Sequence, residues 1–221
     1  MKHDDFEFEH APGLPAPLPP GEYLLWQGSP HWPALAVRAF HVRKVAVYFA
    51  VMVGWRFAYL ESLPDLRALA ALKGTLPATG LALVGLALLA GLAYASARSA
   101  VFSITNRRVL LRHGIALPLT LNVPFREIDA AAVVRHRDGS GSLVLTPARA
   151  SRVGYLLNWP YVRPGRYAHP EPMLRALADI DPVARILAGA LAAATAGSVP
   201  RAATPVIGVS TPRLHTEALS A

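Results

Sequence analysis

The chain contains no cysteine, which excludes disulfides, thiolate chemistry and the zinc or iron–sulfur sites that cysteine builds. Its acidic start, MKHDDFEFEH, has no apolar run, so we expect no cleavable signal peptide. The sequence also lacks a Ser-His-Asp set, a phosphate-binding glycine loop and metal-ligand spacing. These absences predict a protein that is not an enzyme and has no resident cofactor or metal.

Charged side chains are also missing from residues 75–97. As an α-helix this stretch would measure about 34 Å, and a bilayer core is about 30 Å thick. Just upstream, residues 45–60 carry a single charge, Arg56. Its guanidinium can reach the interface near Leu60; an intramembrane carboxylate or cofactor partner is the less favoured alternative. We therefore predict a transmembrane hairpin over residues 45–97, with spans at about 43–60 and 75–97.

The charges that flank these spans predict their orientation. Between them, Glu61 and Asp65 are offset by Arg67 and Lys73. The outer flanks are more basic and include Arg43, Lys44 and Arg98. The positive-inside rule then places both termini in the cytoplasm. We expect a multi-pass membrane protein.

The net charge of +8 comes entirely from the second half of the chain. Residues 98–221 hold fifteen arginines against seven acidic residues, whereas residues 1–97 sum to zero. A basic cytoplasmic part would face the anionic leaflet, where each well-placed cation contributes about 1 kcal/mol. Nucleic acid is the weaker interpretation, because no nucleic-acid-binding motif is present. Membrane lipids are therefore expected partners, and nucleic acid is not.

The remaining segments differ in composition. Residues 1–20 read as an acidic, Pro-rich tether. Residues 21–44 predict a short strand, Tyr23–Trp26, and an amphipathic helix from Pro33 to Lys44 that lies on the membrane surface. Residues 98–195 form the predicted cytoplasmic domain, and residues 196–221 read as a disordered tail.

Short strands with close turns dominate the predicted domain. Thr105-Asn106-Arg107-Arg108 marks one hairpin apex, and residues 138–141, Asp-Gly-Ser-Gly, mark another. Residues 171–195 read as helical, with a restart at Asp181. The predicted fold is therefore an α+β membrane protein: a two-helix transmembrane hairpin plus a small antiparallel β domain, similar to a pleckstrin-homology (PH) domain, capped by a C-terminal helix.

Two groups of residues are candidate contacts. The first combines arginines and aromatic residues, which are enriched at interfaces. For residues 149–169, a strand or loop that completes the β domain is an equally weighted alternative. The members of this first group are Arg107, Arg108, Arg112, Trp159, Tyr161, Arg163 and Arg166. The second is a stripe of small residues for helix packing, for which the protein's own first span is the favoured partner: Ala87, Gly91 and Ala95. At His41 an interfacial cation is favoured over a cofactor ligand.

Three stretches resemble the bacterial PH-like membrane proteins: GEYLLWQGSP, FSITNRRVLLRHG and PFREIDAAAVVRHRDGSGSLVL. The wider arrangement, including NWPYVRPGRYAHPEPMLRAL, resembles the photosynthetic-complex assembly proteins of purple bacteria within that group. The resemblance covers about residues 1–195. It implies an assembly factor for the reaction centre and its light-harvesting 1 antenna, whose subunits would be partners in the intracytoplasmic membrane. It supplies no catalytic residue, and it leaves homo-oligomers and bacteriochlorophyll handling open.

Overall fold

The computed structural model describes residues 17–63, 68–149 and 154–196. The acidic head and most of the predicted tether lie outside these ranges, as do Arg152 and the predicted tail beyond Ala196. In chain order the elements are β1 (Leu24–Gly28), α1 (Trp32–Arg38), α2 (Val42–Glu61), α3 (Ala68–Ser99), β2 (Val101–Thr105), β3 (Arg108–His113), β4 (Leu119–Pro124), a 3-10 turn η1 (Phe125–Glu127), β5 (Ile128–Arg135), β6 (Gly141–Pro147), α4 (Tyr155–Asn158), β7 (Met173–Leu177) and α5 (Ile180–Ala196).

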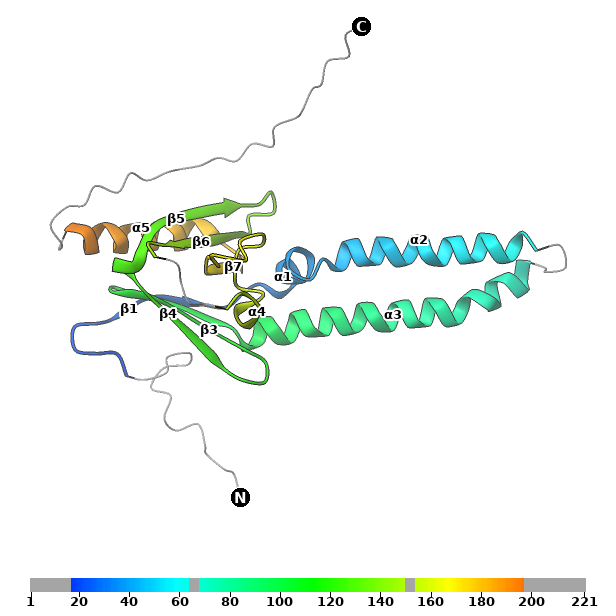
Figure 1. The fold of residues 1–221 in the computed structure, drawn as a ribbon, viewed down its shortest axis with the longest axis horizontal. Coiled ribbons are helices and arrows are strands. Elements are labelled where there is room, and N and C mark those ends of the chain that lie inside the picture. The colour runs from blue at the N-terminus through cyan, green and yellow to red at the C-terminus, as the bar shows by residue number, and fades with distance from the viewer. Residues whose placement is uncertain (1–16, 64–67, 150–153, 197–221) are drawn as a thin grey trace, which may run out of the picture.

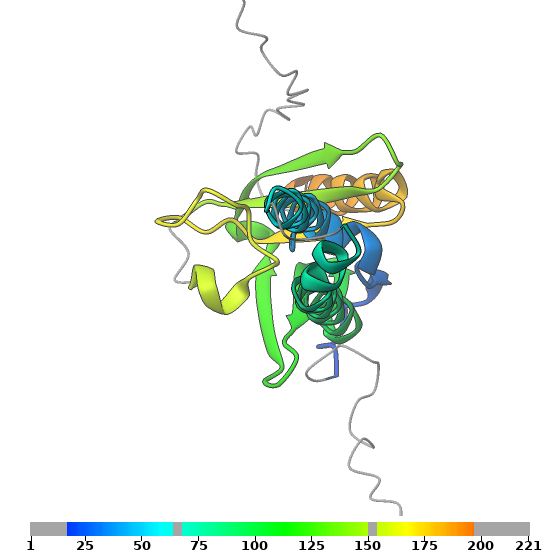
Figure 2. The same cartoon turned by 90° about the vertical axis from the view of Figure 1, so that its right-hand side faces the viewer.

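Helices α2 and α3 run side by side and project from a β domain (Figures 1 and 2). Helix α2 matches the predicted first span to within one residue at each end. Helix α3 starts seven residues earlier than predicted, because the alanines and leucines after residue 67 are strong helix formers. Pro77 lies inside α3, and Figure 1 shows the first turns of the helix bent from the rest.

The strands form two antiparallel sheets among the described residues. The first has the order β1-β2-β3-β4 and the second β5-β6-β7. Strand β1 pairs with β2 although the whole helical hairpin separates them in sequence: Gln27 lies opposite Ser103 and Gly28 opposite Phe102. The predicted strand Tyr23–Trp26 is thus displaced to Leu24–Gly28. Strand β1 therefore shares a sheet with β2, β3 and β4, which belong to the domain predicted over residues 98–195.

Helix α1 differs from the surface helix predicted over residues 33–44. It ends at Arg38, and His41 adopts a left-handed conformation with φ 54° before α2 begins. Leu35 is fully buried against the domain core, and Arg38 forms an ion pair with Asp138 of the domain at 2.7 Å. Amphipathic spacing identified an apolar face but did not show that this face packs against protein.

The end of the domain also differs from its prediction. Residues 173–177, predicted as helix, form strand β7, whose five residues are all buried. Only α5 is helical, and its buried residues Ile180, Val183 and Leu187 close the core. Phe102 and Ile104 from the first sheet share that core with Leu143 and Leu145 from the second. The predicted antiparallel β domain with a closing helix is confirmed.

Candidate functional site

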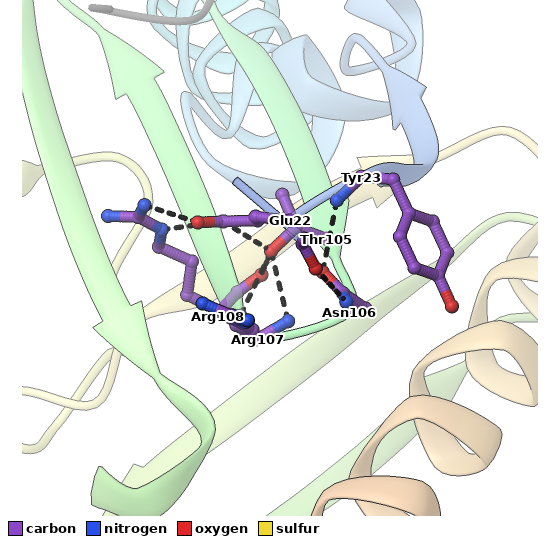
Figure 3. A network of polar contacts seen from close by, with 7 residues as sticks. Glu22, Tyr23, Thr105, Asn106, Arg107 and Arg108 are labelled. Carbon is purple, nitrogen blue, oxygen red and sulfur yellow. Dashed lines mark hydrogen bonds and ion pairs between the residues drawn. The ribbon is translucent and has the colours of Figure 1, made fainter. Parts of the chain in front are cut away.

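The turn between β2 and β3 is held by the side chain of Thr105. Its Oγ1 accepts hydrogen bonds from the backbone N–H groups of Arg107 and Arg108, at 3.2 and 3.0 Å. It also donates to Glu22 Oε1 at 2.8 Å (Figure 3). Threonine can satisfy a turn locally in this way. The predicted hairpin apex at residues 105–108 is confirmed, and it is tied to the segment that precedes β1.

Asn106 makes the second tie between these segments. Its Oδ1 accepts from the Tyr23 backbone N–H at 3.1 Å, and its Nδ2 donates to the Gly21 carbonyl at 2.9 Å. Gly21 has a φ of +77°, which a side chain would strain. The turn residues and the Gly-Glu pair of the N-terminal motif therefore fit each other as one unit (Figure 3).

Glu22 and Arg108 form a largely buried ion pair. The Glu22 side chain is 2% exposed and accepts from both Arg108 Nε, at 2.7 Å, and an Arg108 terminal nitrogen. The hydrogen bond from Arg108 lowers the pKa of Glu22, although burial opposes the shift. The same bond raises the pKa of Arg108. This carboxylate is an ionised structural anchor, and the Arg108 guanidinium, a candidate outside contact, is engaged inside the protein.

The other candidate contacts separate into buried and exposed positions. Tyr161 is 1% exposed, packs on Phe102 and donates its hydroxyl proton to the Ser96 carbonyl at 2.8 Å, so it is a core residue. Trp159 is partly exposed and meets Phe40 edge-on. Arg107 is exposed, and Arg112 is half-buried.

Arg163 and Arg166 both pair with the buried carboxylate of Glu171, at 2.9 and 3.8 Å. Their own side chains are about half exposed. The structure therefore brings these two arginines together with each other but not with Arg107. Arg152, which belongs to the same sequence segment, lies outside the described residues.

The small-residue stripe of α3 does not face α2. Ala87 and Gly91 are exposed, and a Cβ added at Gly91 would meet nothing within 4 Å. The residues that α3 buries lie on another face and include Ala82 and Ala93. This stripe was expected to pack against the protein's own first span, but that contact is not observed.

An apolar hollow of about 1000 Å³ opens beside the Glu22 network. One wall is α5, with Leu187, Leu191 and several alanines; the other is β5 and η1. Arg107 and Arg126 stand at its edge. The hollow could not be predicted from the sequence, because it depends on the distance between two elements that are far apart in the chain. The alanine-rich face of α5 was the available signal.

Two buried polar residues were also missed. Arg175 donates to the carbonyls of Pro160 and Arg38, at 3.1 and 2.6 Å, and so joins β7 to α1. His113 is 3% exposed and bonds Asn158 at 3.1 Å; burial lowers its pKa. The described residues contain no group of three His, Asp or Glu side chains that could hold a metal ion.

Arg56 finds a backbone partner in the hairpin. Its Nε and one terminal nitrogen each donate to the Gly74 carbonyl at 3.2 Å. Gly74 lies three residues before Pro77, where a proline ring disturbs the helical hydrogen bonds. No carboxylate of the described residues pairs with Arg56.

Among the described helices, α3 alone is long and apolar enough to cross a membrane. Helix α2 is more highly charged, since every run of 18 consecutive residues in it includes three of the four charged residues Arg43, Lys44, Arg56 and Glu61. Nevertheless α2 buries none of its residues, and Val47, Val51 and Trp55 are more than 60% exposed. By length and composition, the predicted pair of spans is supported for α3 only.

Residues 37–191 match the family described as "Bacterial PH domain", which covers more than half of the chain. The chain belongs to this bacterial PH domain family. It is similar to a Rhodobacter capsulatus protein named "Uncharacterized 23.7 kDa protein in puhA 5'region", with 38% identity over 192 residues, or 86% of this chain and 89% of that protein. No solved structure matches the chain. The resemblance to PH-like membrane proteins is thus confirmed.

Proposed function

We propose that this protein is a non-enzymatic assembly factor for the photosynthetic reaction centre and light-harvesting 1 complex. In this role it would have the activity implied by its resemblance to the purple-bacterial assembly protein PuhB. The helical hairpin would hold it in the inner, intracytoplasmic membrane, and the PH-type domain would contact subunits and anionic lipid from the cytoplasmic side.

The pairing of β1 with β2 supports a hairpin that crosses the membrane twice. These strands precede and follow the two helices, yet they bond to each other in one sheet. Both strands must therefore lie on the same side of a bilayer, and the chain between them must cross an even number of times. Since α3 has the length and composition of a span, α2 would be the second.

The dimensions and charges of α2 are compatible with this role. Twenty helical residues measure about 30 Å, the thickness of the hydrocarbon core. Arg43 and Lys44 lie at the domain end of α2, and Glu61 lies at the far end. Arg56, one turn from that far end, shares its charge with a carbonyl of α3. This distribution supports cytoplasmic termini under the positive-inside rule.

The photosynthetic part of the proposal has one observation as its main support, the similarity to the R. capsulatus protein. Its name places that protein in the 5′ region of puhA. The similarity extends over most of both chains, so it includes the hairpin as well as the domain. We take this position beside puhA, with the sequence resemblance, as support for a role in photosynthetic assembly.

Deletion of the gene in its own host, without changing the neighbouring transcripts, tests the proposal. We expect membranes with reduced near-infrared absorption from reaction centre and light-harvesting 1, restored by a plasmid copy of the full chain. Normal amounts of both complexes would contradict the assembly role. The family alternative, a PH-type membrane protein that binds anionic lipid or a peptide unrelated to photosynthesis, would then be favoured.

A further inference from the structure

The hollow between β5 and α5 lies at an unpaired sheet edge. Strand β5 has eight residues and bonds only β6 among the described strands. Its opposite edge therefore has no partner strand among the described residues, and residues 128–131 and 133 of this same strand line the hollow. An exposed edge strand is a ready template for another extended chain. A lipid acyl chain would leave the backbone N–H and C=O groups of this edge without partners.

The shape of the hollow fits a short extended segment. Its lining runs along β5 from Ile128 to Val133 and along α5 from Ala184 to Thr195. At about 3.3 Å per strand residue and 1.5 Å per helix residue, both walls are about 17 Å long. This length accommodates about five extended residues. Leu143, Leu187 and Leu191 give the hollow an apolar interior for alternate side chains.

The charges at the rim favour an acidic segment. Arg107 and Arg126 are exposed, line the hollow and form no ion pair with any described residue. Glu22 is already neutralised by Arg108. Asp129 is the remaining acidic residue of the lining. Two arginines without an ion-pair partner among the described residues therefore stand against one carboxylate.

The position of the hollow in the domain indicates where a bound segment could come from. The C-terminal part of α5 lies at the end of the domain farthest from the helical hairpin (Figure 1). A lipid that remained in the bilayer holding the hairpin would be at the opposite end of the domain. A cytoplasmic segment of another protein would have access.

We propose that the hollow binds an extended acidic–apolar peptide segment of a partner protein, which adds to the edge of β5. Alternate apolar side chains enter the hollow, and carboxylates of the segment that remain at its rim reach Arg107 and Arg126. Strand addition provides main-chain hydrogen bonds, and the hollow provides side-chain selectivity. The binding mode is inferred from the geometry of the hollow alone. Only the choice of a photosynthetic subunit as the partner rests on the proposed function.

The test uses the full chain in phosphatidylcholine nanodiscs and a fluorescein-labelled peptide, Glu-Val-Glu-Phe-Glu-Val. Fluorescence anisotropy should show binding of this peptide and none of its counterpart with Lys at every Glu. Arg126→Glu should weaken binding at least tenfold, as should Ala188→Trp, which fills the hollow. Their matched controls on α5, Arg185→Glu and Ala193→Trp, are exposed and do not line the hollow, and they should bind as the wild type does.

Hydrogen exchange of the same complex tests the strand addition. Peptide should slow exchange of backbone amides in residues 128–133. Binding without this protection, or equal loss in the control variants, would overturn the proposal. Absence of peptide binding would also overturn it. This includes the outcome in which native mass spectrometry finds a single-chain amphiphile or a second copy of the chain bound instead of the peptide. None of these results would alter the deletion phenotype, which tests the assembly role separately.

Discussion

Glu22 and Arg108 come from positions 86 residues apart, and their pairing fixes the strand before the hairpin to the strand after it. Removal of one member of a buried ion pair leaves the other charge desolvated and unpaired. We expect Arg108→Ala to lower the free energy of unfolding by about 3 kcal/mol. For a protein of this size, the melting temperature should fall by about 6–12 °C.

Thermal unfolding of the purified chain provides the measurement, and Arg107→Ala is the matched control. Arg107 is the neighbouring arginine, but its side chain is exposed and forms no ion pair with a described residue. Its substitution should leave the melting temperature nearly unchanged. Equal effects of the two variants would show that the pair contributes little.

His113 gives the stability of the domain a dependence on pH. Burial lowers its pKa below the ordinary value of 6.5, so the folded protein binds its proton less readily than the unfolded chain. The free energy of unfolding is therefore highest above pH 6.5 and should decrease as the pH falls below it. His113→Gln retains an N–H donor for Asn158 and removes the titration.

Denaturant unfolding between pH 7.5 and 5.5 should accordingly show a shallower slope for His113→Gln than for the wild type. Part of the slope should remain, because burial and Arg38 also lower the pKa of His136. An unchanged slope would mean that His113 does not contribute to the pH dependence.

At the scale of elements, Tyr161 connects the loop after α4 to the end of α3. Its hydroxyl donates to the Ser96 carbonyl in a buried site. Tyr161→Phe should cost about 1 kcal/mol, the usual net contribution of one hydrogen bond. Tyr167→Phe is the control, since that side chain is 71% exposed. Chemical unfolding of the two variants should separate them clearly; an equal effect would contradict the assignment of Tyr161 to the core.

Some elements could be predicted from local sequence and others could not. The turn at residues 105–108 was predictable because the Thr105 side chain bonds the backbone of Arg107 and Arg108 within the turn itself. Strand β7 was not, because its Met, Leu and Ala residues favour helices and show no alternation when every position is buried. Arg108 and Tyr161 were predicted as contacts because their residue types favour interfaces, but burial was not visible from sequence. The partners Glu22 and Ser96 are distant along the chain.

At the scale of the whole molecule, the absence of cysteine makes the proposed topology directly measurable. Ser62→Cys lies at the end of α2 far from the domain, and Ala178→Cys lies in the domain between β7 and α5; both positions are exposed. In intact spheroplasts a membrane-impermeant maleimide should label only Ser62→Cys. Ala178→Cys should react only after the membrane is permeabilised. Labelling of both from outside, or of neither, would contradict a hairpin that crosses twice.

The sheet register also sets an order of events during synthesis. Strand β1 and helix α1 leave the ribosome before α2 and α3, but their partner β2 follows the entire hairpin. Until residues 101–105 emerge, β1 has an open edge and Leu35 lacks its finished surroundings. A nascent chain that ends before β2 cannot complete its first sheet. If both helices enter the bilayer as proposed, completion of the domain would have to wait for them, because β2 follows α3 in the chain.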